Sequence, residues 1–258
     1  MGVINVTPDS FSDGGLYHST DRAVEHAKCL IEEGADILDV GGESTRPGSA
    51  FVSVDEELSR VIPVIRTLTR LNFATSIDTS KPQVMQQAIE AGVTMINDVN
   101  ALREPGALEA VANSETLICL MHMQGQPSTM QENPQYMDVV DDVMSFLQQR
   151  MDAALAVDIA QDRIVVDPGF GFGKSLTHNL QLLNRLGDFK KLGVPILAGL
   201  SRKSMLGIIT GNDVSQRVHE SVAAALLAAV KGAKILRVHD VKATKDALAV
   251  YNAMIDTN

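Results

Sequence analysis

Eight short apolar runs occur along the chain, and segments with helical periodicity separate them. The runs lie near residues 2–6, 36–40, 74–78, 94–97, 116–121, 163–167, 194–198 and 234–238. Strands that alternate with helices predict a parallel sheet with right-handed crossovers. Eight such units in 258 residues favour a single closed (β/α)8 barrel, for which about 250 residues is typical. An open doubly wound sheet is the alternative.

Most of the eight runs end in a polar residue or are closely followed by one. These residues are Asn5, Asp39, Asp78, Asn97, His122, Asp167, Ser201 and Arg237. In a parallel barrel the carboxyl ends of all strands face one mouth, where barrel enzymes carry their active sites. A turn or a cap explains one or two such residues but not nearly all of them. The pattern therefore indicates an enzyme with its active site at that mouth.

A pattern of Gly, then Ala or Val, then an apolar run occurs four times. It begins at Gly34, Gly92, Gly193 and Gly232. A glycine just past a helix takes a left-handed conformation, which ends the helix before the next strand. The position five residues after each Gly is polar in three of the four copies, at Asp39, Asn97 and Arg237. The irregular spacing indicates one repeated supersecondary unit and not a solenoid.

Five longer segments have apolar residues at helical spacing. They cover residues 54–70, 138–157, 176–186, 215–231 and 241–256. Ser53 and Glu56 form a capping-box pattern at the start of the first segment. The Ala-rich face of 215–231 suits either close packing on a sheet or a contact between subunits.

Composition limits the partners. A formal net charge of −10 argues against nucleic acid, but it leaves open an anionic small molecule bound by clustered cations. No apolar run reaches the roughly 20 residues of a membrane span, and no leader pattern precedes the first strand. Cys29 and Cys119 are expected to be free thiols in a reducing cytoplasm, not a disulfide or a metal pair.

Two motifs resemble other sites but differ in detail. Residues 169–175 look like a nucleotide phosphate loop, but that pattern requires Gly where the chain has Pro168. A dinucleotide fingerprint lacks its acidic ribose ligand downstream, and the histidines are scattered singly, which disfavours zinc.

The first strand begins directly at Met1, which leaves the amino-terminal floor of a barrel without a covering segment. We expect either that other residues close the floor or that the chain is a shortened form lacking the usual N-terminal floor segment.

The loops that follow the strands are rich in Gly, Pro, Asp, Ser and Thr. They cover residues 5–15, 39–48, 77–82, 96–98, 121–125, 167–174, 199–204 and 237–240. In this order they closely resemble the dihydropteroate synthases over essentially the whole chain. The most specific are the first loop, Asp-Pro-Gly-Phe-Gly-Phe-Gly-Lys at 167–174, Ser-Arg-Lys-Ser at 201–204 and Arg-Val-His-Asp at 237–240.

The resemblance implies a single pterin-binding (β/α)8 barrel domain over residues 1–258. The family condenses 6-hydroxymethyl-7,8-dihydropterin diphosphate with p-aminobenzoate, giving 7,8-dihydropteroate and diphosphate with the assistance of Mg²⁺. Diphosphate leaves first, and the arylamine then attacks a pterin-methyl cation. The family is usually dimeric through barrel helices, so a homodimer is expected.

The resemblance also implies roles for individual residues. The pterin contacts are Asp78, Asn97, Met121, Asp167 and Lys203, and the diphosphate contacts are Asn5, Arg237 and His239. Asn5 is in addition the residue linked to the metal. The p-aminobenzoate contacts are Thr45, Arg46, Pro47, Phe172 and Ser201. The catalytic candidates are Asp78, Asp167, Lys203, Arg237 and His239.

The chemistry of the side chains agrees with these roles. A dihydropterin presents an edge of N–H donors, for which a buried carboxylate such as Asp167 is a natural two-point acceptor. One neutral oxygen, as in Asn5, suits Mg²⁺, which keeps waters and binds largely through substrate phosphates. Taken alone, Asp167 is also compatible with a turn before Pro168, Asn5 with a cap, and Lys203 with a solvated surface charge.

Two other functions stay open. A pterin-binding methyltransferase barrel would share the Asp and Asn contacts but has no use for the elements at 201–204 and 237–240. A non-catalytic pterin binder would not require the first two loops. Diphosphate release that depends on p-aminobenzoate distinguishes all three.

Overall fold

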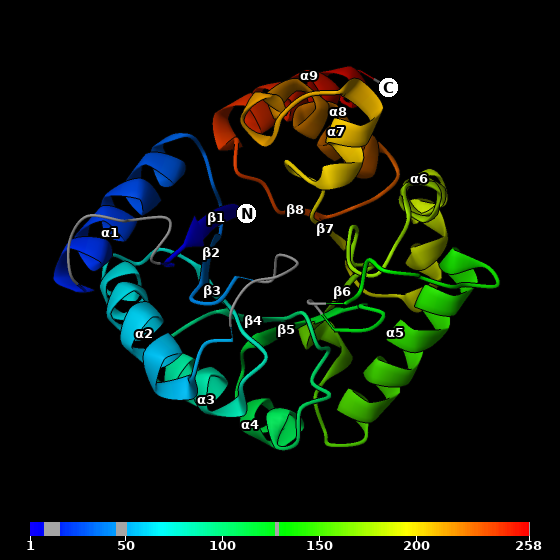
Figure 1. Cartoon of the computed structure of the whole chain (residues 1–258). Coiled ribbons are helices and arrows are strands. Elements are labelled where there is room, and N and C mark those ends of the chain that lie inside the picture. The colour runs from blue at the N-terminus through cyan, green and yellow to red at the C-terminus, as the bar shows by residue number, and fades with distance from the viewer. Residues whose placement is uncertain (8–15, 45–50, 127–128, 258) are drawn as a thin grey trace.

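The computed structural model describes residues 1–7, 16–44, 51–126 and 129–257. Each predicted apolar run overlaps a parallel strand. The strands are β1 (Gly2–Asn5), β2 (Leu38–Gly41), β3 (Thr75–Asp78), β4 (Met95–Asp98), β5 (Leu117–Met121), β6 (Ile164–Asp167), β7 (Leu197–Ala198) and β8 (Ile235–Leu236). In a view along the barrel, the strands form an inner ring and the helices an outer one (Figure 1).

The ring of strands is continuous. Strands β1 to β6 form one sheet in sequence order, and β7 pairs with β8. A parallel bridge between Val166 and Ile196 joins β6 to the segment that leads into β7. A second parallel bridge, between Gly2 and Val238, joins the segment after β8 to β1. The barrel is therefore closed, as predicted, and the open-sheet alternative is wrong.

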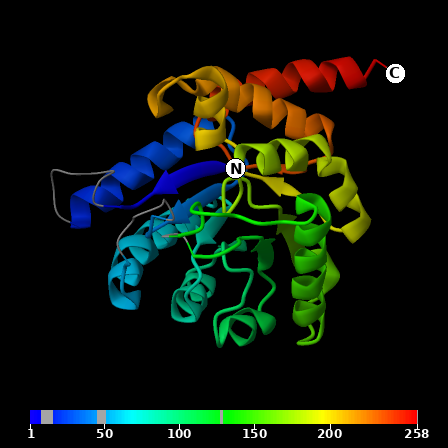
Figure 2. The same ribbon diagram turned by 45° about the vertical axis from the view of Figure 1, so that its right-hand side comes forward.

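The five predicted helices are confirmed within a few residues at each end. The helices are α1 (Leu16–Glu32), α2 (Val54–Arg70), α3 (Pro82–Glu90), α4 (Ala107–Ala112), α5 (Val139–Leu155), α6 (Leu176–Asn184), α7 (Ser204–Thr210), α8 (Val218–Val230) and α9 (Val241–Ile255). Short 3-10 helices cover Gln161–Arg163, Leu186–Leu192 and Val214–Gln216. Helices α8 and α9 pack against each other on one side of the barrel (Figure 2). Within the described ranges, no helix is long and apolar enough to cross a membrane.

Alternation along the strands separates an inner from an outer core. Side chains two residues apart on a strand point to the same face. Inside the barrel, one buried apolar cluster consists of Met1, Met95, Cys119, Val165 and Leu197. The larger core lies between the outer faces of the strands and the helices. Two residues beyond Met95 and Val165 stand Asn97 and Asp167, so the apolar interior is followed by a polar layer at the mouth.

The four repeated glycines have the conformation that their position predicts. Gly34, Gly92, Gly193 and Gly232 have φ angles of 99°, 92°, 72° and 108°. These left-handed angles strain any residue with a Cβ, and each glycine stands between a helical segment and the next strand. The pattern is therefore confirmed as a stop signal that turns the chain back into the barrel.

The capping box predicted at α2 is half formed. The Ser53 hydroxyl accepts a hydrogen bond from Glu56 N, but the Glu56 side chain pairs with Arg60 and does not return to Ser53. A complete capping box occurs instead at α6, between Ser175 and His178. The predicted hydrogen bond between the Glu56 side chain and Ser53 N was wrong, because Arg60, four residues along the helix, competes for the Glu56 carboxylate.

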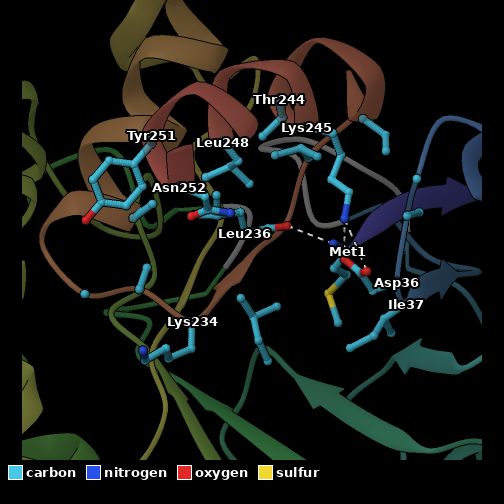
Figure 3. Close-up of a pocket in the computed structure, with 18 of the residues that line it drawn as sticks. Met1, Asp36, Ile37, Lys234, Leu236, Thr244, Lys245, Leu248, Tyr251 and Asn252 are labelled. Carbon is cyan, nitrogen blue, oxygen red and sulfur yellow. Dashed lines mark hydrogen bonds and ion pairs between the residues drawn. The ribbon is translucent and has the colours of Figure 1, made fainter. Parts of the chain in front are cut away.

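A cavity of about 530 Å³ lies at the amino-terminal end of the barrel, opposite the mouth. Its lining comes from the starts of β1, β2 and β8 and from α8 and α9 (Figure 3). The Met1 amino group donates to Leu236 O over 3.0 Å, and Lys245 pairs with Asp36 over 3.2 Å at its edge.

Candidate active site

A network of four polar side chains crosses the carboxyl-terminal mouth. Arg237, just after β8, donates from Nε to Asp39 Oδ2 over 2.6 Å and from Nη2 to Asp78 Oδ2 over 2.8 Å. Asn97 Nδ2 donates to the same Asp39 oxygen over 3.1 Å. These side chains belong to β2, β3, β4 and the end of β8, so the barrel framework fixes their geometry.

The network holds two carboxylates for one guanidinium. Asp39 is fully buried, and its Oδ1 atom has no hydrogen-bond partner among the described residues. Burial raises the pKa of Asp78 to about 7, although the Arg237 guanidinium acts in the opposite direction. Burial also acts against the charge on Arg237, but the two carboxylates raise the pKa of Arg237 above its usual value. Arg237 is thus a permanent cation whose Nη1 edge takes no part in these ion pairs.

The raised pKa of Asp78 predicts a pH-dependent stability. Because the folded state binds this proton more tightly than the unfolded state, the stabilisation is complete below about pH 4 and lost as pH rises through about 7. Asp78→Asn keeps an uncharged side chain, so between about pH 5 and pH 8 its Tm should fall by about 5 °C less than that of the unsubstituted chain. Thermal unfolding across this range tests the difference, and parallel Tm curves for the two proteins would contradict it.

Asp167 and Lys203 lie beside this network. A Cβ atom on Gly199 would lie 3.8 Å from Arg237 Cβ and 4.0 Å from Asp167 Oδ2, so Arg237 and Asp167 border the same glycine. Asp167 is 5% exposed, and its Oδ1 atom accepts a hydrogen bond from Gly169 N over 2.7 Å. Burial raises the pKa of Asp167, whereas the Lys203 ammonium lowers it. Burial likewise lowers the pKa of Lys203 to about 8, while Asp167 raises it.

An apolar wall adjoins Asp167. Met121 lies opposite Asp167 in the register of β5 and β6 and packs in a cluster with Met123 and Met130, against which Phe172 is partly buried. The Lys203 ammonium lies 4.5 Å from the centre of the Phe172 ring and also donates to Phe170 O. A carboxylate, an ammonium and an apolar wall suit a flat ligand that carries hydrogen-bonding groups on its edge.

The glycines of the loop after β6 lie against the backbone of the loop after β5. Gly169 and Gly173 have φ angles of +69° and +64°. A Cβ on Gly169 would lie 1.9 Å from His122 O, and one on Gly173 would lie 2.3 Å from Gln124 O. Only glycine permits both this conformation and this close approach.

This contact predicts different costs for two Gly→Ala substitutions. Gly211 at the end of α7 is also left-handed, with φ +79°, but nothing lies within 4 Å of a Cβ there. Gly211→Ala should cost about 1 kcal/mol of unfolding free energy, from backbone strain alone. Gly169→Ala adds a backbone collision and should cost more than about 4 kcal/mol. Denaturant unfolding of both variants measures the difference, and similar costs would show that the loop moves freely.

Ser201 and His239 are joined at the mouth after β7 and β8. The Ser201 hydroxyl lies 3.0 Å from His239 Nδ1 and accepts a hydrogen bond from His239 N over 3.2 Å. Next to this pair, Arg202 forms a two-point ion pair with Asp240. The pairing of Arg202 with Asp240 ties together the loops that carry Lys203 and His239.

One predicted residue does not join this mouth, and three others lie outside the described residues. His122 is buried, but it follows the inward-facing Met121 and makes an edge contact with Phe146 of α5, on the outer side of the barrel. Its expected convergence on the mouth was wrong, because side chains alternate along a strand. The predicted p-aminobenzoate contacts Thr45, Arg46 and Pro47 lie outside the described residues, as does most of the first loop.

Asn5 is the remaining predicted residue, and it bears on the metal. It is exposed at the end of β1, and a Cβ on Gly41 would lie 4.0 Å from Asn5 Oδ1 and 3.9 Å from Asp78 Oδ2. In the part of the chain that the structure describes, no group of three or more His, Cys, Asp or Glu could hold a metal ion. One neutral oxygen beside a carboxylate fits Mg²⁺ carried largely by a diphosphate, and not a dedicated protein cage.

Three features of the site have no role assigned from the sequence. Asp39 is a polar strand end that shares its repeat position with Asn97 and Arg237, which indicates that the three side chains lie at the same mouth. The buried Lys174 gives no such signal, because it follows a glycine-rich run that is usually exposed. The third is an ion cluster in which Lys81 contacts Glu43 and Glu57 over 2.5 Å each.

Comparisons with known proteins agree with this geometry. A family model described as "Pterin binding enzyme" matches residues 1–239. Dihydropteroate synthase of Haemophilus influenzae is 52% identical over 254 residues, which cover 98% of this chain and 92% of that protein. The structure of Xanthomonas albilineans dihydropteroate synthase with 4-aminobenzoic acid has a TM-score of 0.93 at 55% identity and covers 98% of this chain and 92% of its own. A structure of that enzyme with 7,8-dihydropteroate has a TM-score of 0.90 at 53% identity, with the same coverage.

The closed barrel and its polar mouth thus define an enzyme of the pterin-binding class. About half of the residues are identical over nearly the whole of each chain, so the sequence similarity includes the loops as well as the strands and helices. The chain belongs to the dihydropteroate synthase family.

Proposed function

We propose that the chain is a single pterin-binding barrel domain that joins 6-hydroxymethyl-7,8-dihydropterin diphosphate to p-aminobenzoate. The observation that carries this proposal is the adjacency of two subsites at one mouth. Asp167 with Lys203 and the Met121 wall suits a flat pterin, and Arg237 with His239 suits a diphosphate. Gly199, which has no side chain, lies between Asp167 of the first subsite and Arg237 of the second.

The pterin subsite combines hydrogen bonding with burial. Asp167 accepts N–H donors on the guanidine-like edge of the ring, and Lys203 donates to its carbonyl side. Asn97 and Asp78 complete the ring contacts from the neighbouring strands. The desolvated site supports this assignment, because hydrogen bonds to charged groups are stronger away from water.

The diphosphate subsite supplies positive charge. The Nη1 edge of Arg237 and the His239 side chain bind the departing diphosphate, whose charge grows as the bond to carbon breaks. Asn5 and the diphosphate would hold Mg²⁺, which would supply further charge neutralisation when bound.

The arylamine subsite lies toward Phe172 and Ser201, and the proposal adds Thr45, Arg46 and Pro47 to it. Phe172 would pack on the aromatic ring, and the Ser201 hydroxyl would donate to the carboxylate. Burial of the ring against Phe172 would also keep water away from the reacting carbon.

The proposed reaction needs no covalent enzyme intermediate. The C–O bond to diphosphate breaks, and its electron pair leaves with the diphosphate. The resulting pterin-methyl cation is stabilised by the carboxylates of Asp167 and Asp78. The arylamine nitrogen attacks that carbon with its lone pair and then loses one proton to solvent, which gives 7,8-dihydropteroate.

We also propose a homodimer. Leu227 and Val230 on α8 and Val250 and Met254 on α9 are exposed apolar residues on neighbouring helices. Exposed apolar patches of this kind commonly mark contact surfaces between subunits. Light scattering should give twice the chain mass of 27.7 kDa, whereas a monomer at micromolar concentration would refute the dimer.

We infer a cytoplasmic location from the thiols. Cys29 is exposed and Cys119 is buried, and the two are unpaired. Free cysteines are usual where the environment is reducing. A thiol titration of freshly isolated protein should find both sulfurs reduced.

The function is tested by measuring both products. With both substrates and Mg²⁺, we expect dihydropteroate and diphosphate in equal amounts, and no diphosphate release when p-aminobenzoate is omitted. Tight pterin binding without product would instead indicate a non-catalytic binder. Transfer of a methyl group from methyltetrahydrofolate would indicate the methyltransferase alternative.

A further inference from the structure

The loop between β6 and α6 is held by side chains and not by regular secondary structure. Five consecutive carbonyl groups, from Gly169 to Gly173, each accept a hydrogen bond from a side chain. The donors, in the order of the carbonyls, are Lys174 Nζ, Lys203 Nζ, Gln131 Nε2, Lys174 Nζ and Tyr136 Oη. Lys174 therefore holds two of the five and clamps the loop near both of its ends.

Lys174 is itself enclosed. Its residue is 2% exposed, and its ammonium lies 2.9 Å from Gly169 O, 3.0 Å from Phe172 O and 2.9 Å from His122 Nδ1. A fourth, longer contact reaches His122 O at 3.4 Å. Three close acceptors match the three N–H donors of an ammonium group. Burial lowers the pKa of His122 to about 2, so the imidazole is neutral, and its Nδ1 accepts from Lys174 in the tautomer protonated at Nε2. Burial also lowers the pKa of Lys174, while Asp167 raises it.

The contacts of Lys174 lead to Phe172. The carbonyl of Phe172 is fixed by Lys174, and the Phe172 ring lies under the Lys203 ammonium. Glycines flank Phe172 on both sides, and glycine restricts the backbone less than any other residue. The local sequence therefore does little to fix the backbone at Phe172. The position of the ring therefore depends on the side chains that hold the loop.

We propose that Lys174 is a positioning residue for the arylamine substrate and acts through Phe172. It is enclosed by protein atoms, so it does not contact the substrate. Its hydrogen bonds to the two carbonyls, braced against His122 just after the neighbouring strand β5, hold the Phe172 ring where p-aminobenzoate packs. This inference rests on the proposed function.

The first test replaces Lys174 by Met, which keeps an unbranched side chain that is one atom shorter but removes all three donors. In Lys174→Met, KM for p-aminobenzoate should rise about tenfold, while kcat and the Kd for pterin diphosphate should change less than about threefold. Lys191→Met is the matched control, because Lys191 is exposed on the 3-10 helix Leu186–Leu192. In this control, KM for p-aminobenzoate, kcat and the Kd for pterin diphosphate should stay unchanged.

A double-mutant cycle shows whether Lys174 acts through Phe172. Phe172→Ala alone should raise KM for p-aminobenzoate, and the double variant should show the same KM as Phe172→Ala. Effects that multiply would mean that the two residues act independently, which would overturn the proposal. An unchanged KM in a folded Lys174→Met variant would overturn it as well.

A second variant covers the case in which Lys174→Met does not fold. His122→Leu removes the brace but leaves Lys174 bonded to the two carbonyls, so KM for p-aminobenzoate should rise about threefold, again without an added effect on Phe172→Ala. No rise in KM would refute the proposal. If the unsubstituted protein makes dihydropteroate, either negative result refutes the positioning role alone, whereas no dihydropteroate would refute the proposed function itself.

Discussion

Asp167→Asn is expected to weaken the binding of 6-hydroxymethyl-7,8-dihydropterin diphosphate about 100-fold, close to 2.7 kcal/mol. The amide replaces one acceptor oxygen by a donor, which would face the N–H edge of the pterin in a buried site. Breaking a two-point, charge-assisted contact away from water commonly costs this much. Calorimetric titration of the pterin diphosphate, without the arylamine, measures the effect.

A control at the opposite end of the same strand separates this effect from a general loss of fold. Asp162 precedes β6 and is exposed, so Asp162→Asn makes the same chemical change away from the mouth. It should leave both pterin affinity and Tm unchanged. If Asp167→Asn bound the ligand as tightly as the unsubstituted chain, Asp167 would be excluded from the pterin site.

Arg237→Met is expected to affect stability and activity together. It removes the cation between two carboxylates and leaves Asp39 buried without its charged partner, which should cost about 3 to 5 kcal/mol of unfolding free energy. It also removes the charge that faces the diphosphate, so kcat/KM should fall about 1000-fold. Denaturant unfolding and steady-state kinetics measure the two effects separately.

Arg185→Met is the matched control for Arg237→Met. Arg185 also pairs with carboxylates, those of Asp138, Asp141 and Asp188, but at the surface. Solvent screens such pairs, so this variant should unfold and turn over much like the unsubstituted chain. The loss of unfolding free energy in Arg237→Met should also become smaller as pH falls, because protonated carboxyl groups need no cation. If Arg185→Met and Arg237→Met lost equal amounts of unfolding free energy and of activity at neutral pH, the account would be contradicted.

The barrel is predictable because its signals are local. Apolar runs, helical spacing and the left-handed glycines at 34, 92, 193 and 232 each depend on a few neighbouring residues. Once a parallel barrel is predicted, its geometry brings the strand ends together, which is why the sequence alone places Asp78, Asn97, Asp167 and Arg237 at one mouth. The pairings within the mouth are not predictable in this way. That Arg237 contacts Asp39 and Asp78 depends on the register between strands distant in sequence.

Two residues show where the sequence signal ends. The pattern of polar strand ends groups His122 with the mouth, although Leu117, Cys119 and Met121 set the inward face of its strand, so strict alternation places it outside. Lys174 and Lys203 both follow loops that contain glycine, and nothing local distinguishes the fully enclosed lysine from the one beside the mouth. The difference arises from tertiary packing, here the carbonyl groups of the loop from Gly169 to Gly173.

The division of the mouth into a pterin subsite and a diphosphate subsite is tested most directly by a crystal structure with the pterin diphosphate bound. We expect the N–H edge of the ring within about 3 Å of the Asp167 carboxylate and the diphosphate oxygens on Arg237 and His239. A pterin bound elsewhere, such as in the cavity beside Met1 and Tyr251, or a diphosphate away from Arg237, would contradict the account.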